Sequence, residues 1–170
     1  MFRVHRLGVA AGAAVAGIAI ICTIGAPAGA ALIMHKDLSH DVALTIAEGA
    51  IQACKAMGYA TSAVVVDRDG ETLVAMRGDG ASIHTLENAR RKAYTANTFK
   101  QPTGEYAKKL QDPNSVVHQQ VTLPNVIAID GGLPIKVGNE VIGGIGISGS
   151  PGVDSQCSSA GLDKAKDELQ

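Results

Sequence analysis

The chain has 170 residues, a length that fits one domain with a sizeable core and is short for two. It carries 15 Lys and Arg against 16 Asp and Glu, and no stretch of it is a basic block. Nucleic acid and anionic membranes are therefore poor candidate partners.

The first residues have the pattern of a secretory signal peptide. Basic residues precede an apolar run over 7–24, which ends in the small-residue cleavage pattern "GAPAGAAL". A membrane anchor is the alternative, but the many glycines and alanines of the run would make a weak span. The sequence predicts that residues 1–31 are removed on export and that 32–170 form a single domain in the periplasm or outside the cell.

Two cysteines, Cys54 and Cys157, remain after this cleavage. An exported protein meets an oxidising compartment, in which such a pair can form a disulfide. Two buried thiols are the simpler interpretation, since Cys54 lies beside the apolar stripe of a predicted helix. The bridge is the alternative.

A helix followed by a hairpin is predicted in the first part of this domain. Apolar residues recur at steps of three and four over 42–57, with Ser39 as N-cap and Gly58 as the stop. Two β-rich runs then flank Asp69-Gly70, a dipeptide typical of hairpin turns.

A second helix is predicted over 83–99, and a short third one from Thr103. Residues 112–123 are polar and without period, which makes them the best candidate for a functional loop. Three short strands follow, "NVIAID", "LPIKV" and "EVIGGIGIS", and a last helix begins near Asp154. The predicted fold is α+β, a five-stranded antiparallel sheet flanked by helices in the order α-β-β-α-α-β-β-β-α.

The last of these strands leads into a G-x-G-x-x-G pattern at Gly144, Gly146 and Gly149. A dinucleotide site needs a second parallel strand after the glycine turn and helix, and too little chain follows Gly149 for one. We therefore predict no nucleotide-binding residues. The glycines indicate a thinned strand on which a helix packs closely, or over which a flat ligand lies.

Four stretches together resemble one known family. They are "VVVDRDGETLVAMRGDGAS", "ARRKAYTANTF", "DGGLPIKVGNEVIGGIGISG" and "CSSAGLDKAKDEL", and in order and spacing they resemble the GlcG/HbpS family, the haem-degrading or DUF336 domain. The resemblance covers about 38–169. It implies a five-stranded antiparallel sheet, homo-oligomers built from dimers up to octamers, haem as cofactor, and in some members a sensor partner or haem degradation.

The chain departs from the family pattern at two places. Asp130 stands before Gly131 and Gly132 where the family often has a further glycine, so a carboxylate joins this candidate ligand loop. The stretch "VVHQQVTL" replaces a Tyr-Gly-Leu-like segment and supplies His118.

Haem capture asks for an axial ligand, usually His, and for a cation near the propionates. The candidate iron ligands are His118 in the polar loop, His84 at the start of the second helix and His40 at the start of the first. Arg91 and Lys92 are the candidate propionate or anion partners. The alternative for these two is a solvated helix face, with Glu87 paired to Arg91.

The lead hypothesis is an exported, oligomeric haem-binding protein that stores, senses or degrades haem. One alternative is a regulatory or structural oligomer without enzymatic activity that partners another exported or membrane protein. The other is an accessory factor that binds a small organic acid such as glycolate, near Lys92, Arg91 and Asp130. No catalytic residue is identified, and the sequence holds no common hydrolase or metalloprotease motif.

Overall fold

Four antiparallel strands form one sheet in the order β2-β1-β4-β3. The computed structural model describes residues 32–170, so the predicted signal peptide lies outside the described residues. Among the residues described, none of the helices is long and apolar enough to cross a membrane. The elements are α1 (His40–Ala56), β1 (Ser62–Asp67), β2 (Thr72–Arg77), α2 (Ile83–Phe99), α3 (Thr103–Lys108), η1 (Lys109–Gln111), α4 (Val117–Gln120), β3 (Gly132–Val137), β4 (Glu140–Ser148), α5 (Asp154–Lys164) and η2 (Lys166–Glu168).

The prediction of a fifth strand is wrong, because "NVIAID" forms no strand. The backbone of this segment is bonded to side chains of α2 instead of to a neighbouring strand. The Ile127 amide donates to Thr95 Oγ1 over 2.9 Å, and Arg91 donates to the Val126 carbonyl over 2.6 Å. Asn125 adopts a positive φ of 70°, which interrupts an extended conformation.

The local signals at the first helix and at the two hairpins are confirmed. Ser39 caps α1, its hydroxyl accepting from the Val42 amide over 3.3 Å. Gly70 and Gly138 take positive φ values of 85° and 60° in the β1–β2 and β3–β4 turns. These positions need no tertiary context, because the turn itself requires a left-handed residue.

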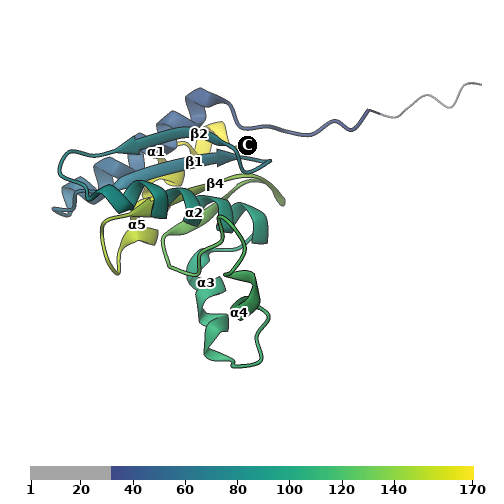
Figure 1. Cartoon of the computed structure of the whole chain (residues 1–170). Coiled ribbons are helices and arrows are strands. Elements are labelled where there is room, and N and C mark those ends of the chain that lie inside the picture. The colour runs from purple at the N-terminus through teal and green to yellow at the C-terminus, as the bar shows by residue number, and fades with distance from the viewer. Residues whose placement is uncertain (1–31) are drawn as a thin grey trace, which may run out of the picture. The chain divides into compact units, whose positions relative to one another are not determined.

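Large aliphatic side chains fill the space between one face of the sheet and the helices α1 and α5, which lie behind the sheet in Figure 1. Each strand contributes to this core, and α1 adds Ile46 and several alanines. The residues of the sheet in this core are Ala63, Val65, Val74, Ile135, Ile142, Ile145 and Ile147. Burial of these apolar groups is the main stabilising term of the fold.

A disulfide between Cys54 and Cys157 joins α1 to α5 inside the same core. Their Sγ atoms are 2.00 Å apart, and both residues are completely buried. The structure thus has the bridge, where the simpler interpretation of the sequence was a pair of buried thiols.

Helix α2 covers the opposite face of the sheet, in front of it in Figure 1, and packs backbone to backbone on β4. A Cβ added to Gly144 would collide with the Ala93 carbonyl oxygen, and one added to Gly146 would collide with that of Ala89. The prediction of a thinned strand on which a helix packs closely is confirmed.

The segment between α2 and β3 has a small core of its own. Tyr106 of α3 is buried with Val117 of α4 and Val126, and its ring stacks on Phe99 at 4.5 Å. The predicted polar loop 112–123 therefore contains a short helix and one buried anchor, Val117.

Candidate functional site

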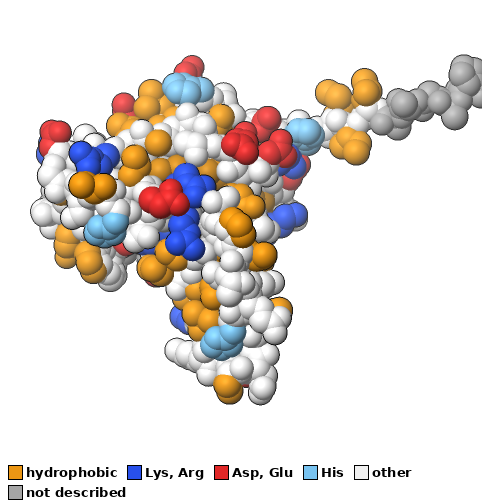
Figure 2. Space-filling model, in the orientation of Figure 1, with side chains coloured by type: hydrophobic (Ala, Val, Ile, Leu, Met, Phe, Trp, Pro, Cys, Tyr) orange, Lys and Arg blue, Asp and Glu red, His pale blue; other side chains and the backbone are white. Residues whose placement is uncertain are grey.

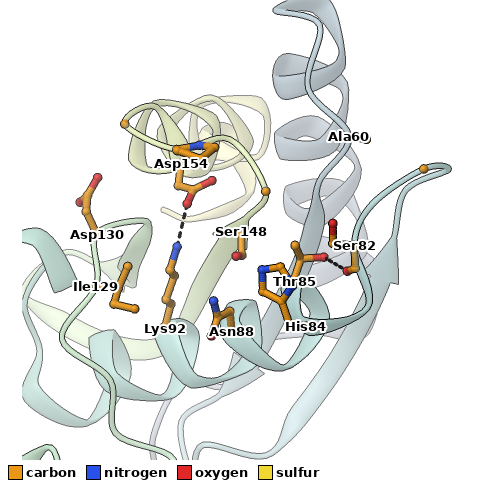
Figure 3. A pocket seen from close by; sticks show the side chains of 14 residues that line it. Ala60, Ser82, His84, Thr85, Asn88, Lys92, Ile129, Asp130, Ser148 and Asp154 are labelled. Carbon is orange, nitrogen blue, oxygen red and sulfur yellow. Dashed lines mark hydrogen bonds and ion pairs between the residues drawn. The ribbon is translucent and has the colours of Figure 1, made fainter.

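A cavity of about 480 Å³ opens beside the N-terminal half of α2. Its other walls come from the end of β4, from the loop that leads into α5, and from Ile129 and Asp130 before β3 (Figure 3). The volume falls within the usual range for small-molecule sites. The lining is mixed, and its polar members include His84, Asn88, Lys92, Asp130, Ser148 and Asp154.

Helix α2 supplies one side of the cavity through residues spaced by four. His84, Asn88 and Lys92 therefore lie one above the other on one face of the helix. Ala89 and Ala93, on the neighbouring face, rest against the glycines of β4. The close packing of α2 on β4 fixes where these three side chains stand.

Lys92 is almost completely buried, 1% exposed, and is held in an ion pair. Its Nζ donates to Asp154 Oδ2 over 2.7 Å and to the Ile147 carbonyl over 2.9 Å. Asp154 Oδ1 in turn accepts from the amide and the hydroxyl of Ser150. Because both partners of this buried pair are satisfied by protein groups, its charge is neutralised within the fold.

The three candidate histidines are not brought together, and the histidines on the face drawn in Figure 2 lie apart from one another. His118 is exposed on α4, and its Nε2 lies 3.1 Å from the Asp112 carbonyl oxygen. His40 is exposed at the start of α1, 3.5 Å from the carboxylate of Asp41. His84 is the one of the three that lines the cavity, and its ring has no hydrogen bond within 32–170.

Arg91 and Lys92 point to different parts of the molecule. The Arg91 guanidinium bonds the Val126 carbonyl and does not line the cavity. Glu87 pairs with Arg90 over 2.7 Å, so the prediction of a pair between Glu87 and Arg91 is wrong. The prediction that Lys92 lies on a solvated helix face is also wrong, because Lys92 is buried.

Asp130 borders the cavity, although its carboxylate lies against Gly104 of α3, and the two glycines after it serve the packing of the fold. Gly131 has a φ of 117°, and its carbonyl accepts from the Ile147 amide and from Ser158 Oγ. The Gly132 amide donates to Thr103 Oγ1 over 2.8 Å. Asp130 also borders a second, shallower cavity next to α3, of about 520 Å³.

Asn88, Ser148 and Asp154 are site residues that sequence reasoning did not select. The spacing of His84, Asn88 and Lys92 was a usable signal, because it places all three on one helical face. Ser148 and Asp154 come from segments distant in sequence, and only the fold brings them to α2. Over 32–170, no cluster of three or more metal-ligating side chains is found.

Comparison with known families gives one match, over residues 38–163, to the family described as "Haem degrading protein HbpS-like". A curated relative, the uncharacterised 15.0 kDa protein in the dhaT-dhaS intergenic region of Citrobacter freundii, is 36% identical over 86 residues. That alignment spans half of this chain and 61% of the relative, so the relative is matched over less than two thirds of its length.

Solved structures resemble this fold closely. A crystal structure of HbpS has a TM-score of 0.72 and 36% identity, covering 78% of this chain and 92% of that one. Klebsiella pneumoniae ORFY, a DUF336 protein, has a TM-score of 0.71 and 26% identity, with 79% and 98% covered. A PduOC:haem complex, at 23% identity and a TM-score of 0.70, covers 76% and 95% and shares the fold.

Proposed function

The chain belongs to the HbpS-like family, and from that membership we propose that it is a haem-binding protein with His84 as the iron ligand. The observation that carries the proposal is the position of His84, an exposed imidazole in the lining of a cavity with no hydrogen-bond partner among residues 32–170. Neutral imidazole is the commonest protein ligand of haem iron, and an unpartnered ring needs no rearrangement to bind it.

The residues around His84 fit a haem held at the rim of the cavity, not one enclosed inside it. Ile129, 47% exposed, offers an apolar contact in the cavity lining. Inside the cavity, Lys92 is already paired with the carboxylate of Asp154. A propionate would therefore find no free lysine there, and we place the porphyrin outside the polar floor. When bound, haem would supply the iron chemistry, and His84 would orient and hold it.

We propose that a second copy of the chain covers the other face of the macrocycle. A haem at the rim of one subunit leaves one apolar face in water, and burial of that face favours association. This proposal supports a dimer-based homo-oligomer, up to an octamer, and leaves room for a sensor partner on the remaining surface.

Export after cleavage of 1–31 is part of the same proposal. The support is the signal-peptide pattern together with the Cys54–Cys157 disulfide, because such bridges persist in oxidising compartments and are rare in the cytosol. Haem degradation would be an added activity, which a time course of haemin absorbance with a reductant would reveal.

Titration of purified protein with haemin, followed by the Soret band, tests the function. We expect a saturable band at micromolar protein and a loss of affinity of about tenfold or more in His84→Ala, which corresponds to about 1.4 kcal/mol of binding free energy. His40→Ala and His118→Ala are the matched controls and should keep the affinity of the unmodified protein.

Two results would contradict the proposal. The absence of a saturable band would leave the regulatory oligomer as the better function. A band that survives His84→Ala and disappears in His118→Ala would move the iron to α4 and refute the assignment of His84.

A further inference from the structure

The two edges of the sheet differ in how they are protected. Within residues 32–170 the outer strands are β2 and β3, and the free side of each carries backbone donors and acceptors that a further strand could bond. In β3, Pro134 has no amide to donate and Lys136 adds an exposed charge, and both features discourage pairing between chains. In β2 the residues from Thr72 to Met76 are uncharged, and none is proline. The edge at β2 is therefore the one that is open to a further strand.

The second half of β2 has the regular alternation that pairing needs. Its one shift of register with β1 lies near the start of the strand. Ala75 is exposed and lies opposite Val64, on the side of α2. Val74 and Met76 pack into the core on the other side, under α1. Any strand that pairs with β2 must match this alternation.

A second copy of β2 matches the alternation through a two-fold axis. With the axis at Ala75, an antiparallel pair sets Ala75 opposite its own counterpart and Val74 opposite Met76. Directly opposite residues of an antiparallel pair share a face, and Val74 and Met76 lie on the same face. An axis at Val74 would instead set Ala75 against Leu73, which packs on the α1 side. The sequence of β2 thus selects the axis at Ala75.

The charges at the two ends of β2 are complementary in this register. Glu71 precedes the strand and Arg77 ends it; both are exposed, and neither is in an ion pair within the described part of the chain. Arg77 stands opposite Leu73, so Glu71 of the second copy is its diagonal neighbour. Diagonal neighbours are about 7–8 Å apart, which long side chains can bridge. Because the axis repeats this contact, the dimer gains two pairs of opposite charge.

The same second copy would cover an apolar groove beside β2. A shallow cavity of about 270 Å³ lies between β2 and α2, and its lining includes Ala75, Ile83 and Leu86. Ile83, the first residue of α2, is 85% exposed. Since α2 lies in front of the sheet in Figure 1, the axis at Ala75 brings the grooves of the two copies next to each other on that side. Burial of these side chains favours association.

We propose that two copies of the chain associate through antiparallel β2 strands about a two-fold axis at Ala75. The product is one continuous sheet of eight strands, four from each copy. This interface goes beyond haem binding and forms without haem, because it uses none of the residues assigned to the iron. It also differs from the contact through the macrocycle, and two different two-fold contacts are what an assembly larger than a dimer requires.

Cross-linking of the haem-free Ala75→Cys variant tests the position of the axis. Opposed Cα atoms of an antiparallel pair are about 4.5–5.5 Å apart, a distance that a disulfide spans. The added thiol is free to react, because Cys54 and Cys157 are bonded to each other. We expect a covalent dimer after mild oxidation that a reductant dissolves. Lys136→Cys, on the other edge strand, is the matched control and should give no such dimer.

Analytical ultracentrifugation of charge variants, each with its fold checked by circular dichroism, tests the energetics. Ala75→Lys opposes two like charges at the axis and should weaken the dimer about tenfold or more. Ser159→Lys, at an exposed position of α5, should leave it unchanged. Glu71→Arg and Arg77→Glu should each weaken the dimer about fivefold, and the double variant should restore it. A damaged fold would not be repaired by the second substitution.

Three results would overturn the interface: a haem-free protein that stays monomeric at high micromolar concentration, an Ala75→Lys variant that associates as strongly as the unmodified protein, or cross-linking through Lys136→Cys but not Ala75→Cys. Haemin separates this proposal from haem binding. His84→Ala should lose haemin and remain a dimer. Association that begins only when haemin is added would refute the β2 contact and leave haem binding in place.

Discussion

The two faces of the sheet are held by different means. Under α1 and α5, the core consists of isoleucine and valine side chains with a disulfide across the helices. Under α2 the buried apolar side chains are fewer, chiefly Val64 and Val66 of β1 with two alanines of the helix, and the helix backbone touches Gly144 and Gly146 of β4. The first face depends on buried volume, which tolerates some rearrangement. The second face depends on the close backbone contact between α2 and β4, which leaves no room for rearrangement. The cavity lies on this second face.

The largest effect is expected from Gly146→Leu, which introduces a side chain where α2 rests on β4. A Cβ here would lie 2.6 Å from the Ala93 amide nitrogen, and the obstructing atoms are backbone. Overpacking costs about 1–3 kcal/mol even where side chains can move, so we expect about 3 kcal/mol or more and little folded protein. Urea unfolding followed by circular dichroism measures it.

Gly138→Ala provides the control for this substitution. No atom lies within 4 Å of the added methyl, so only the positive φ of 60° is strained. We expect a loss of about 1 kcal/mol. If Gly146→Leu cost no more than this control, the close contact of α2 with β4 would be refuted.

On the other face, Cys54→Ala with Cys157→Ala should cost about 3 kcal/mol, because the bridge closes a long loop. The cysteines are 103 residues apart in sequence, and the loss arises mainly in the unfolded chain. Urea unfolding of the double variant measures this loss. The unmodified protein, unfolded under reducing conditions, also lacks the bridge and should have a similar stability. Intact mass without reductant is the direct check, and two free thiols in the unmodified protein would contradict the bridge.

The smallest effect is expected at Glu87, on the solvent side of α2. A hydrogen bond from Arg90 lowers the pKa of this carboxyl, against a smaller opposing effect of burial. A lowered pKa adds stability above the unfolded value, near 4.5, and this contribution is lost as pH falls through the folded value. Since the pair is partly exposed, the effect should stay below about 1 kcal/mol.

Glu87→Gln is the variant that isolates this pair. Its stability relative to the unmodified protein should differ at pH 7 and converge at pH 3, as measured by urea unfolding at each pH. A difference that is the same at both values would show that the carboxyl contributes through packing alone.

The sequence predicted best those features that a few neighbouring residues determine. Ser39, Asp69-Gly70 and Gly138-Asn139 mark a cap and two turns whose geometry is local. It failed at "NVIAID", where apolar residues suggested a strand but Thr95 and Arg91 of α2 take the backbone bonds. The predicted strand needed a neighbouring strand to pair with, and only the tertiary fold shows that this segment has none.

The candidate site was predictable only in part, because the sequence identifies residues of suitable chemistry but not which of them the fold brings together. His84, Lys92 and Asp130 were selected from the sequence and do line one cavity, whereas His118, His40 and Arg91 do not. The burial of Lys92 could not be anticipated, because its partner Asp154 is 62 positions away. Ser148 gave no signal, since only the folded protein places it beside α2.

The contact of α2 with β4 also determines how the cavity can respond to a ligand. Asn88 and Lys92 each precede an alanine whose backbone touches a glycine of β4, the strand that ends at Ser148. The spacing across the cavity is therefore set by main-chain atoms and not by rotamers that could readjust. A ligand that fits would lose little free energy to reorganisation of the protein, while one that is slightly too large would be rejected. We therefore expect this site to select ligands by size, with little rearrangement of α2 and β4.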